Sequence, residues 1–328
     1  MISHDAFRRL STVVAIAGLA SSAGLAGAQT DYPARPLRFL VGAAPGGATE
    51  ILARAIGTRL GEKFRQQVVI DTRPGANHII AGEINLQAAP DGYTIQMIPE
   101  GWVINASVYS KLPFDPVRDF TPIGTVAMVP NVLVIHPSIS AKTVPEFIAL
   151  AQRRPGEMSY GTSGVGSPSH MSAEFFKILA KVEYTHVPYK GSGLSLIDLM
   201  GGHLQLSFPS VPASFPHVKA GRLRALGVTT VKRASALPDV PTIQESGVAG
   251  FEVSGWYGVI APRGVVKPLV ERLNREINAV LQMPELSSFL AGQGADPLTG
   301  TPEAFAAAMA NDRVKWAKVV KSAGIKMR

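Results

Sequence analysis

IGTVAMVPNVLVI at residues 123–135 and FEVSGWYGVIA at residues 251–261 decide the fold. Both runs are rich in β-branched or aromatic residues, and both exceed the about five or six residues of an ordinary strand. We interpret them as crossover strands that join two lobes, with the second lobe inserted into the first. This gives a discontinuous first lobe (residues 29–128 and 257–328) and an inserted second lobe (residues 129–256).

Around these runs, short β-rich segments alternate with helical patterns. Residues 37–41 predict a strand, and residues 49–64 place their apolar side chains on one face of a helix. The same order of strand, glycine-containing joint and helix recurs in residues 159–180 and 186–200. This alternation is typical of βαβ units, so we predict the α/β class with mostly parallel sheets.

The N-terminal segment has the layout of a secretory signal peptide. Arg8 and Arg9 precede the uncharged run Leu10–Leu25, and Ala26-Gly27-Ala28 supplies the small residues of a cleavage site. We therefore expect residues 1–28 to be removed on export to the periplasm, by the general or the twin-arginine route. The alternative is a membrane anchor, which the short run rich in Ala, Gly and Ser disfavours.

Composition limits the chemistry of the chain. It has no cysteine, which excludes thiol catalysis and Cys-based metal sites, and its seven histidines form no metal-ligand pattern. We expect neither a metal nor a cofactor. The formal net charge of +8 raises the local concentration of anions. Because Lys and Arg are scattered and form no block, a small anionic ligand is favoured over nucleic acid.

Three glycine-containing joints between a strand and a helix are the candidate anion sites. Residues 45–50 (PGGATE) and 160–170 (YGTSGVGSPSH) offer close backbone approach and free N–H groups at a helix start. Residues 189–193 (YKGSG) form the third joint, with Lys190 as a candidate countercharge. None of them matches a P-loop, a dinucleotide fingerprint or a hydrolase elbow. The alternatives are ordinary turns and, for Lys190, a solvated surface lysine.

Two side chains near these joints have two interpretations each. Glu50 accepts from a ligand donor, or it favours the helix start electrostatically. Trp102 stacks on a ligand, or it packs in a core. The alternative function is an exported hydrolase with Ser163 as nucleophile and His170 or His186 as base, although no hydrolase motif supports it and we expect no catalytic residue.

A series of short segments in a fixed order carries a family resemblance. They are YPARP (32–36), PGG (45–47), RPGA (73–76), PDGYT (90–94), LPFDP (112–116), YGTSGVGS (160–167), HVPYKG (186–191), DLMGG (198–202), LPDVPT (237–242) and WYG (256–258). Over essentially all of the chain after the signal segment, the sequence resembles the Bug-type (Bordetella uptake gene) solute-binding receptors of tripartite tricarboxylate transporters.

The resemblance implies a two-lobed periplasmic binding protein of type II that closes on its ligand like a flytrap through two crossover strands. It further implies a receptor that holds a small organic carboxylate, such as a dicarboxylate, and presents it to membrane permease subunits. We expect a monomer, and the departures from the family pattern described next leave room for an aromatic carboxylate. The family's carboxylate contacts fall on Thr162, Ser163, Gly166 and Ser167, and the contacts to the other end of the ligand fall on residues 45–49.

The chain departs from the family pattern in three places. Residues 42–45 (GAAP) stand where the family has Pro-Phe-Pro-Pro, Glu50 replaces Asp, and Asn77-His78 replaces Gly-Gly. Glu50, His78 and Trp102 are therefore expected to refill space that the missing Phe leaves open. The full set of expected ligand-binding residues is Ala44, Pro45, Gly46, Gly47, Ala48, Thr49, Glu50, Asn77, His78, Trp102, Thr162, Ser163, Gly164, Gly166, Ser167, His170, Tyr189 and Lys190.

Overall fold

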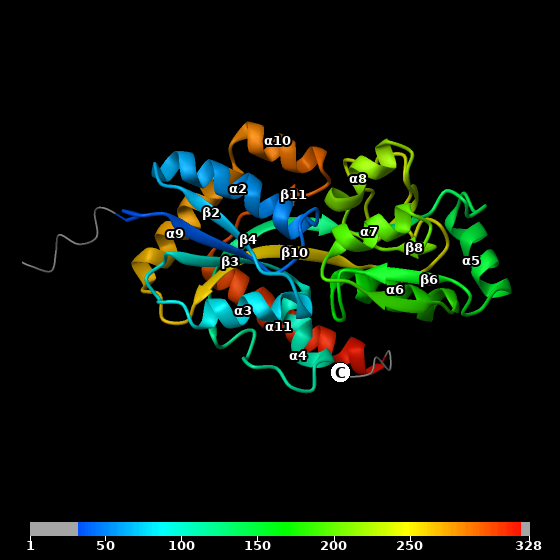
Figure 1. Ribbon diagram of the computed structural model, residues 1–328, viewed down its shortest axis with the longest axis horizontal. Helices are drawn as coiled ribbons and strands as arrows, with labels where there is room; N and C mark the ends of the chain where they lie inside the picture. Colours follow the sequence, from blue (N-terminus) through cyan, green and yellow to red (C-terminus); the bar gives the residue numbers. More distant parts are fainter. Residues whose placement is uncertain (1–31, 323–328) are drawn as a thin grey trace, which may run out of the picture.

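The computed structural model describes residues 32–322, except the side chains of Ser254 and Ser322. It contains two sheets side by side, each covered by helices, and we call the sheets with their helices lobe 1 and lobe 2 (Figure 1). The predicted signal segment, residues 1–28, lies outside the described residues. Among the described residues, no helix is long and apolar enough to span a bilayer.

Lobe 1 is built on a six-stranded sheet of order β11-β4-β10-β3-β1-β2. Its strands are β1 (Leu37–Val41), β2 (Val68–Thr72), β3 (Thr94–Pro99), β4 (Phe120–Pro130), β10 (Ser254–Pro262) and β11 (Asp296–Pro297). Its helices are α2 (Ala48–Phe64), the short 3-10 helix η1 (Ala76–His78), α3 (Ile79–Leu86), α4 (Gly101–Val108), α9 (Lys267–Leu281), α10 (Pro284–Gly292) and α11 (Pro302–Ser322).

Lobe 2 is built on a five-stranded sheet of order β7-β6-β8-β5-β9. Its strands are β5 (Val132–Ile135), β6 (Ser159–Thr162), β7 (Thr185–Pro188), β8 (Leu206–Ser207) and β9 (Arg224–Val228). Its helices are α5 (Val144–Arg153), α6 (Pro168–Ala180), α7 (Ser192–Met200) and α8 (Val211–Lys219).

The two long apolar runs are the crossovers between the sheets. The first forms β4 and β5, which are separated only by Asn131, so one extended stretch belongs to both sheets. The second contains β10, which pairs antiparallel with β4 from Ser254 opposite Pro130 to Pro262 opposite Phe120. The lobe boundaries predicted at 128/129 and 256/257 fall inside β4 and β10.

The sheets are mixed, which corrects the prediction of mostly parallel sheets. β1 pairs parallel with β2 and β3, and β6 pairs parallel with β7 and β8, as βαβ units require. The crossover strands pair antiparallel with their neighbours, since the chain leaves lobe 1 on β4 and returns beside it on β10. A strand that returns from the other lobe must run in the opposite direction.

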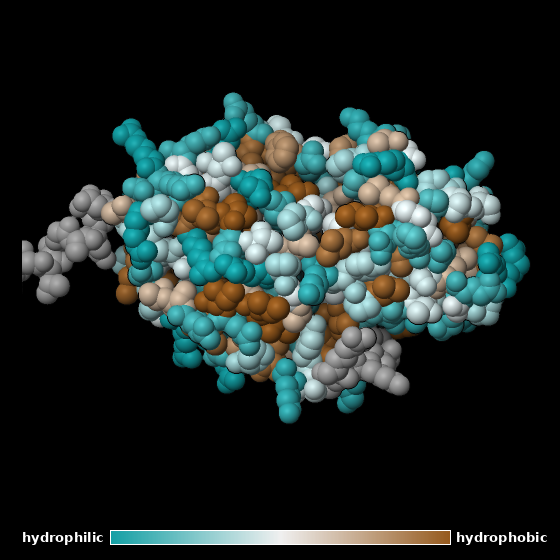
Figure 2. Space-filling view, in the orientation of Figure 1, coloured by the Kyte–Doolittle hydropathy of each residue, from teal (hydrophilic) through white to brown (hydrophobic). Residues whose placement is uncertain are grey.

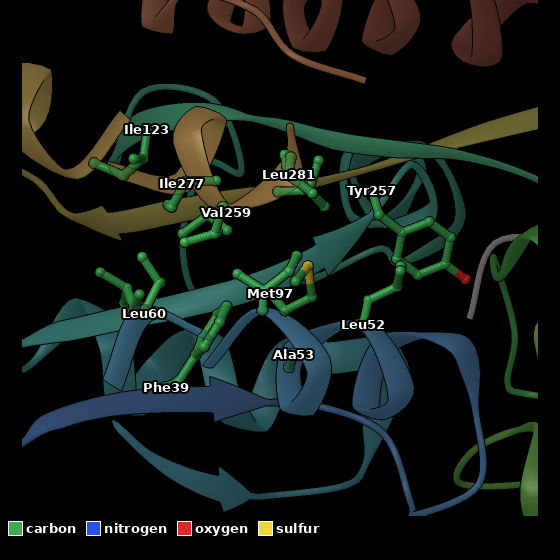
Figure 3. Close-up of a cluster of buried hydrophobic side chains, with 14 of the residues drawn as sticks. Phe39, Leu52, Ala53, Leu60, Met97, Ile123, Tyr257, Val259, Ile277 and Leu281 are labelled. Atoms are coloured by element: carbon green, nitrogen blue, oxygen red, sulfur yellow. The ribbon is translucent and has the colours of Figure 1, made fainter. Parts of the chain in front are cut away.

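Apolar side chains on one face of the lobe 1 sheet pack against helices α2 and α9. Phe39 and Met97 from the sheet meet Leu52 and Leu60 of α2, and Val259 and Ile277 continue the cluster toward α9 (Figure 3). A second cluster joins the lobes, because Ile104 and Val108 of α4 and Trp316 and Val320 of α11 pack with the core of lobe 2. On the face shown in Figure 2, apolar residues form separate patches among polar ones.

Candidate functional site

The first predicted loop joins β1 to α2 at the carboxyl end of the parallel strands. Gly46 takes a left-handed conformation (φ 82°), and Gly47 is the N-cap of α2 without a side-chain cap bond. The first backbone N–H groups of this 17-residue helix therefore have no side-chain acceptor from the cap. An uncapped start of a long helix favours an anion electrostatically.

The second predicted loop joins β6 to α6 and is held by its own hydroxyl groups. Ser167 caps α6 by accepting from the backbone N–H of His170 (3.3 Å), and its hydroxyl donates to the carbonyl of Gly164 (2.6 Å). Ser169 accepts from the backbone N–H of Ser163 (2.9 Å). Gly164 and Gly166 have positive φ values that side chains rarely adopt. These bonds fix the loop in one shape.

The third loop, between β7 and α7, touches the first one directly. The backbone N–H of Ala44 donates to the carbonyl of Lys190 (2.9 Å), a hydrogen bond from lobe 1 to lobe 2. A methyl group added at Gly191 would come within 2.8 Å of the Ala44 nitrogen, and one added at Gly193 would overlap the Pro45 carbonyl oxygen. The two loops can meet only because both are rich in glycine.

The third loop also carries Tyr189 and Lys190, two of the predicted ligand-binding residues. The side chain of Lys190 is exposed, and the residue joins the lobes through its carbonyl. The Tyr189 hydroxyl donates to Asp198 (2.5 Å), and burial together with this carboxylate raises the pKa of Tyr189 to about 12. The role of Lys190 as a countercharge to the ligand therefore stays a prediction.

The segment 75–78 lies between the loops of the two lobes. A methyl group on Gly164 of lobe 2 would lie 3.9 Å from the Asn77 nitrogen, and one on Gly42 would lie 2.6 Å from His78 Nδ1. Asn77 donates through Nδ2 to Asn105 (2.7 Å), and Asn105 donates back to the Asn77 carbonyl (3.0 Å). Asn105, fully buried, was not among the predicted site residues.

Trp102 does not belong to this junction, which corrects its place in the expected set. Its side chain is fully buried, its indole N–H donates to the Pro116 carbonyl (2.8 Å), and its ring stacks on Phe114. The physical reason is that β3 passes directly into α4 at Gly101. The first turn of α4 therefore directs Trp102 into an aromatic cluster on lobe 1.

Glu50 and His170 lie in the loops where the sequence places them. Glu50, in the first turn of α2, is buried and paired with the exposed Arg54 (2.6 Å). His170 accepts from the backbone N–H of Gly166 (3.2 Å), and its ring stacks on His186 with centroids 4.3 Å apart. Among the described residues, no group of His, Asp and Glu side chains could hold a metal ion.

Two buried groups beside the site were missed at the sequence level. Tyr257 of β10 points its hydroxyl away from the lobe 1 core, toward lobe 2 (Figure 3), and pairs with Thr49. Glu100, before α4, accepts from the indole N–H of Trp316 (2.8 Å), and burial raises its pKa to about 8. Both groups lie where a crossover strand or α11 passes between the lobes, a placement that no local motif signals.

The comparisons with known proteins agree on a single family. The model of the tripartite tricarboxylate transporter family receptor matches residues 52–325. Protein BugT of Bordetella pertussis is 32% identical, over 97% of this chain and 99% of its own length.

Two solved structures resemble the chain over most of its length. An R. palustris protein with adipate is 38% identical, with a TM-score of 0.88 over 90% of this chain and 100% of that one. MatC from Rhodopseudomonas palustris with bound malate is 28% identical, with a TM-score of 0.84 over 88% of this chain and 100% of that one.

Proposed function

Because the chain belongs to the tripartite tricarboxylate transporter receptor family, a family of periplasmic binding receptors and not of enzymes, we propose that it captures a small organic carboxylate between its lobes for a membrane permease. The hydrolase alternative is set aside, since the family to which the chain belongs consists of receptors.

One observation carries the proposal: uncapped helix starts from both lobes meet at one junction. Neither α2 of lobe 1 nor α7 of lobe 2 has a side-chain cap bond, and the loops before them are joined by the hydrogen bond from Ala44 to Lys190. Backbone N–H groups at helix starts bind anions without a charged side chain. The loop 160–167 lies beside this junction, because the backbone N–H of Tyr189 donates to the carbonyl of Thr162 (3.0 Å). A ligand whose carboxylate is held on that loop would therefore contact both lobes.

The resemblance and the geometry together suggest how the ligand is divided between the lobes. The carboxylate would be held on the lobe 2 loop by Thr162, Ser163, Gly164, Gly166 and Ser167. The rest of the ligand would face the lobe 1 loops, residues 44–50 and 77–78. Closure then completes the contacts, so the ligand stabilises the closed arrangement over the open one. Adipate and malate in two structural relatives support this ligand class.

Export, maturation and assembly belong to the same proposal. The family's periplasmic location agrees with the charged and apolar N-terminal segment, so we expect cleavage after Ala28. We further expect the receptor to be a monomer that presents its closed form to permease subunits. Mass spectrometry of the protein purified from periplasm would show a chain beginning at Gln29; a retained N-terminus contradicts the cleavage.

A thermal-shift screen tests ligand capture. Mono-, di- and aromatic carboxylates are compared with neutral amides of the same skeleton, such as adipate with adipamide. At a hundred times Kd, a ligand adds about 2.7 kcal/mol of stability and raises Tm by roughly 5 °C. Small-angle X-ray scattering then measures closure as a smaller radius of gyration. Binding without closure, or equal shifts with the amides, would contradict the mechanism.

A further inference from the structure

Ser163 is the hydroxyl residue of the lobe 2 loop that has exposed surface. It follows directly on β6, at the carboxyl end of the parallel pair β6 and β7, the edge at which α/β sheets bind ligands. This edge faces lobe 1, because a methyl group added at the next residue, Gly164, would lie 3.9 Å from Asn77. Ser163 is partly exposed there, whereas the other hydroxyl residues of the loop are buried (Thr162, Ser167 and Ser169).

Ser169, the second residue of α6, lies at the centre of a chain of hydroxyl groups behind Ser163. Its Oγ atom accepts from the backbone N–H of Ser163 (2.9 Å) and lies 3.1 Å from Ser163 Oγ. On its other side, the same atom lies 2.9 Å from Ser167 Oγ. Ser169 was not among the residues expected to bind the ligand. Because it is only 3% exposed, it would act on a ligand through its neighbours.

The protons of the hydroxyl groups determine the direction of this chain. Ser167 has a single proton, which it donates to the Gly164 carbonyl (2.6 Å), so it can only accept from Ser169. Without a ligand, every proton is satisfied when Ser163 donates to Ser169 and Ser169 donates to Ser167. When a carboxylate accepts the proton of Ser163, Ser169 can turn its own proton to Ser163 Oγ. This change rotates two hydroxyl hydrogens and leaves the oxygen atoms in place.

We propose that Ser169 is a positioning residue, which holds the Ser163 hydroxyl in place to donate to the ligand carboxylate. The inference rests on the proposed function, in which the lobe 2 loop holds that carboxylate. A serine side chain has three staggered positions, and fixing one of them before binding lowers the conformational entropy that binding costs. In the bound state, the bond from Ser169 also polarises the Ser163 hydroxyl and so strengthens its charge-assisted bond to the carboxylate.

A double-mutant cycle on the full chain tests whether Ser169 acts through the Ser163 hydroxyl. Isothermal titration calorimetry measures the Kd of the wild type, Ser169→Ala, Ser163→Ala and the double variant. The probe is the tightest-binding carboxylate of the thermal-shift screen, in which adipate and malate are included. Ser163→Ala removes the hydroxyl but keeps the backbone N–H that donates to Ser169, so the cycle separates the two bonds. Ser169→Ala is expected to fold, because Ser167 still caps α6.

The control variant is Ser214→Ala, which should keep the wild-type Kd. Ser214 is also a buried serine of lobe 2, and its hydroxyl donates to the Ser210 carbonyl (3.0 Å) within α8. Ser163→Ala should weaken binding by about tenfold, and Ser169→Ala by about fivefold. In the chain that already carries Ser163→Ala, adding Ser169→Ala should weaken binding by less than about twofold.

Two results would overturn the role of Ser169 while carboxylate capture stands. If Ser169→Ala weakens binding equally with and without the Ser163 hydroxyl, Ser169 only shapes the loop backbone. If either single variant keeps the wild-type Kd, the Ser163 hydroxyl is not held by Ser169 for the ligand. If no carboxylate of the screen binds the wild type at all, the proposed function fails and this inference fails with it.

Discussion

Substituting Gly193 with alanine should weaken ligand binding without weakening the fold. Gly193 is the second residue of α7, and its backbone is not in the left-handed region. Alanine is the better helix former by about 1 kcal/mol, so the open protein should be at least as stable as the wild type. In this structure, where the loops of the two lobes touch, the added methyl group would overlap the carbonyl oxygen of Pro45.

The size of the effect follows from what must move. The obstacle is backbone, which cannot rotate aside as a side chain would, so the two lobes must separate locally. The hydrogen bond from Ala44 to Lys190 (2.9 Å), three residues from the collision, would then lengthen or break. Overpacking of one methyl group costs about 1–3 kcal/mol, which corresponds to roughly a fivefold to hundredfold loss of affinity.

Calorimetry and thermal unfolding distinguish a closure defect from a folding defect. Gly193→Ala should bind the carboxylate more weakly while its Tm without ligand is equal or higher. Gly292→Ala is the matched control, because Gly292 ends helix α10 and a methyl group there meets nothing within 4 Å. Unchanged affinity in Gly193→Ala would refute the idea that the contact between Gly193 and the Pro45 carbonyl belongs to the ligand-bound form.

Two further predictions concern buried polar groups beside the site. Because the pKa of Glu100 is raised to about 8, the folded state keeps a proton on Glu100 at pH values where the unfolded state has released it. The free energy of unfolding of the wild type should therefore fall by on the order of 4 kcal/mol as pH rises from 4.5 to about 8. Urea titrations across this pH range should show no such fall in Glu100→Gln, whereas Glu157→Gln, at an exposed position, should keep it. If the stability of Glu100→Gln still falls with pH, Glu100 is not the group responsible. Asn105→Ala should lower the free energy of unfolding by about 1–3 kcal/mol in urea titrations, because it leaves Asn77 without its hydrogen-bond partner. Asn311→Ala, at an exposed position, should lower it by less than about 0.5 kcal/mol. Equal costs would show that the pair does not hold the segment.

The architecture was predictable where the sequence carried a strong local signal. Two long apolar runs identified the crossovers, β1 has its predicted bounds, and α2 begins one residue before its predicted start and ends where predicted. Helix α8 was missed because Pro212 and Pro216 interrupt its pattern, although Pro212 lies in the first turn, where proline is tolerated. Helix α4 was missed because it follows β3 without a turn signal, and Trp102 was misplaced with it.

The site was predictable as loops but not as contacts, because its partners lie far apart in the sequence. Asn77 is held by Asn105, and Glu100 by Trp316, 216 residues later. No local pattern relates such residues. The glycines of 189–193 identified a joint between a strand and a helix, but only the fold shows that the backbone of residues 44–47 lies against it.

The three departures from the family pattern suggest that the two lobes have different roles, with lobe 2 binding the carboxylate and lobe 1 recognising the rest of the ligand. Residues 42–45, Glu50 and Asn77-His78 all lie on lobe 1, whereas the loop 160–167 on lobe 2 carries none of them. A carboxylate headgroup needs the same backbone geometry whatever is attached to it, so the lobe 2 loop has no physical reason to change with the ligand. The remainder of the ligand differs between receptors, and lobe 1 is the part of this site that must differ with it. Replacing Asn77 and His78 with Gly-Gly should therefore change which carboxylate binds most tightly, while the protein still binds carboxylates.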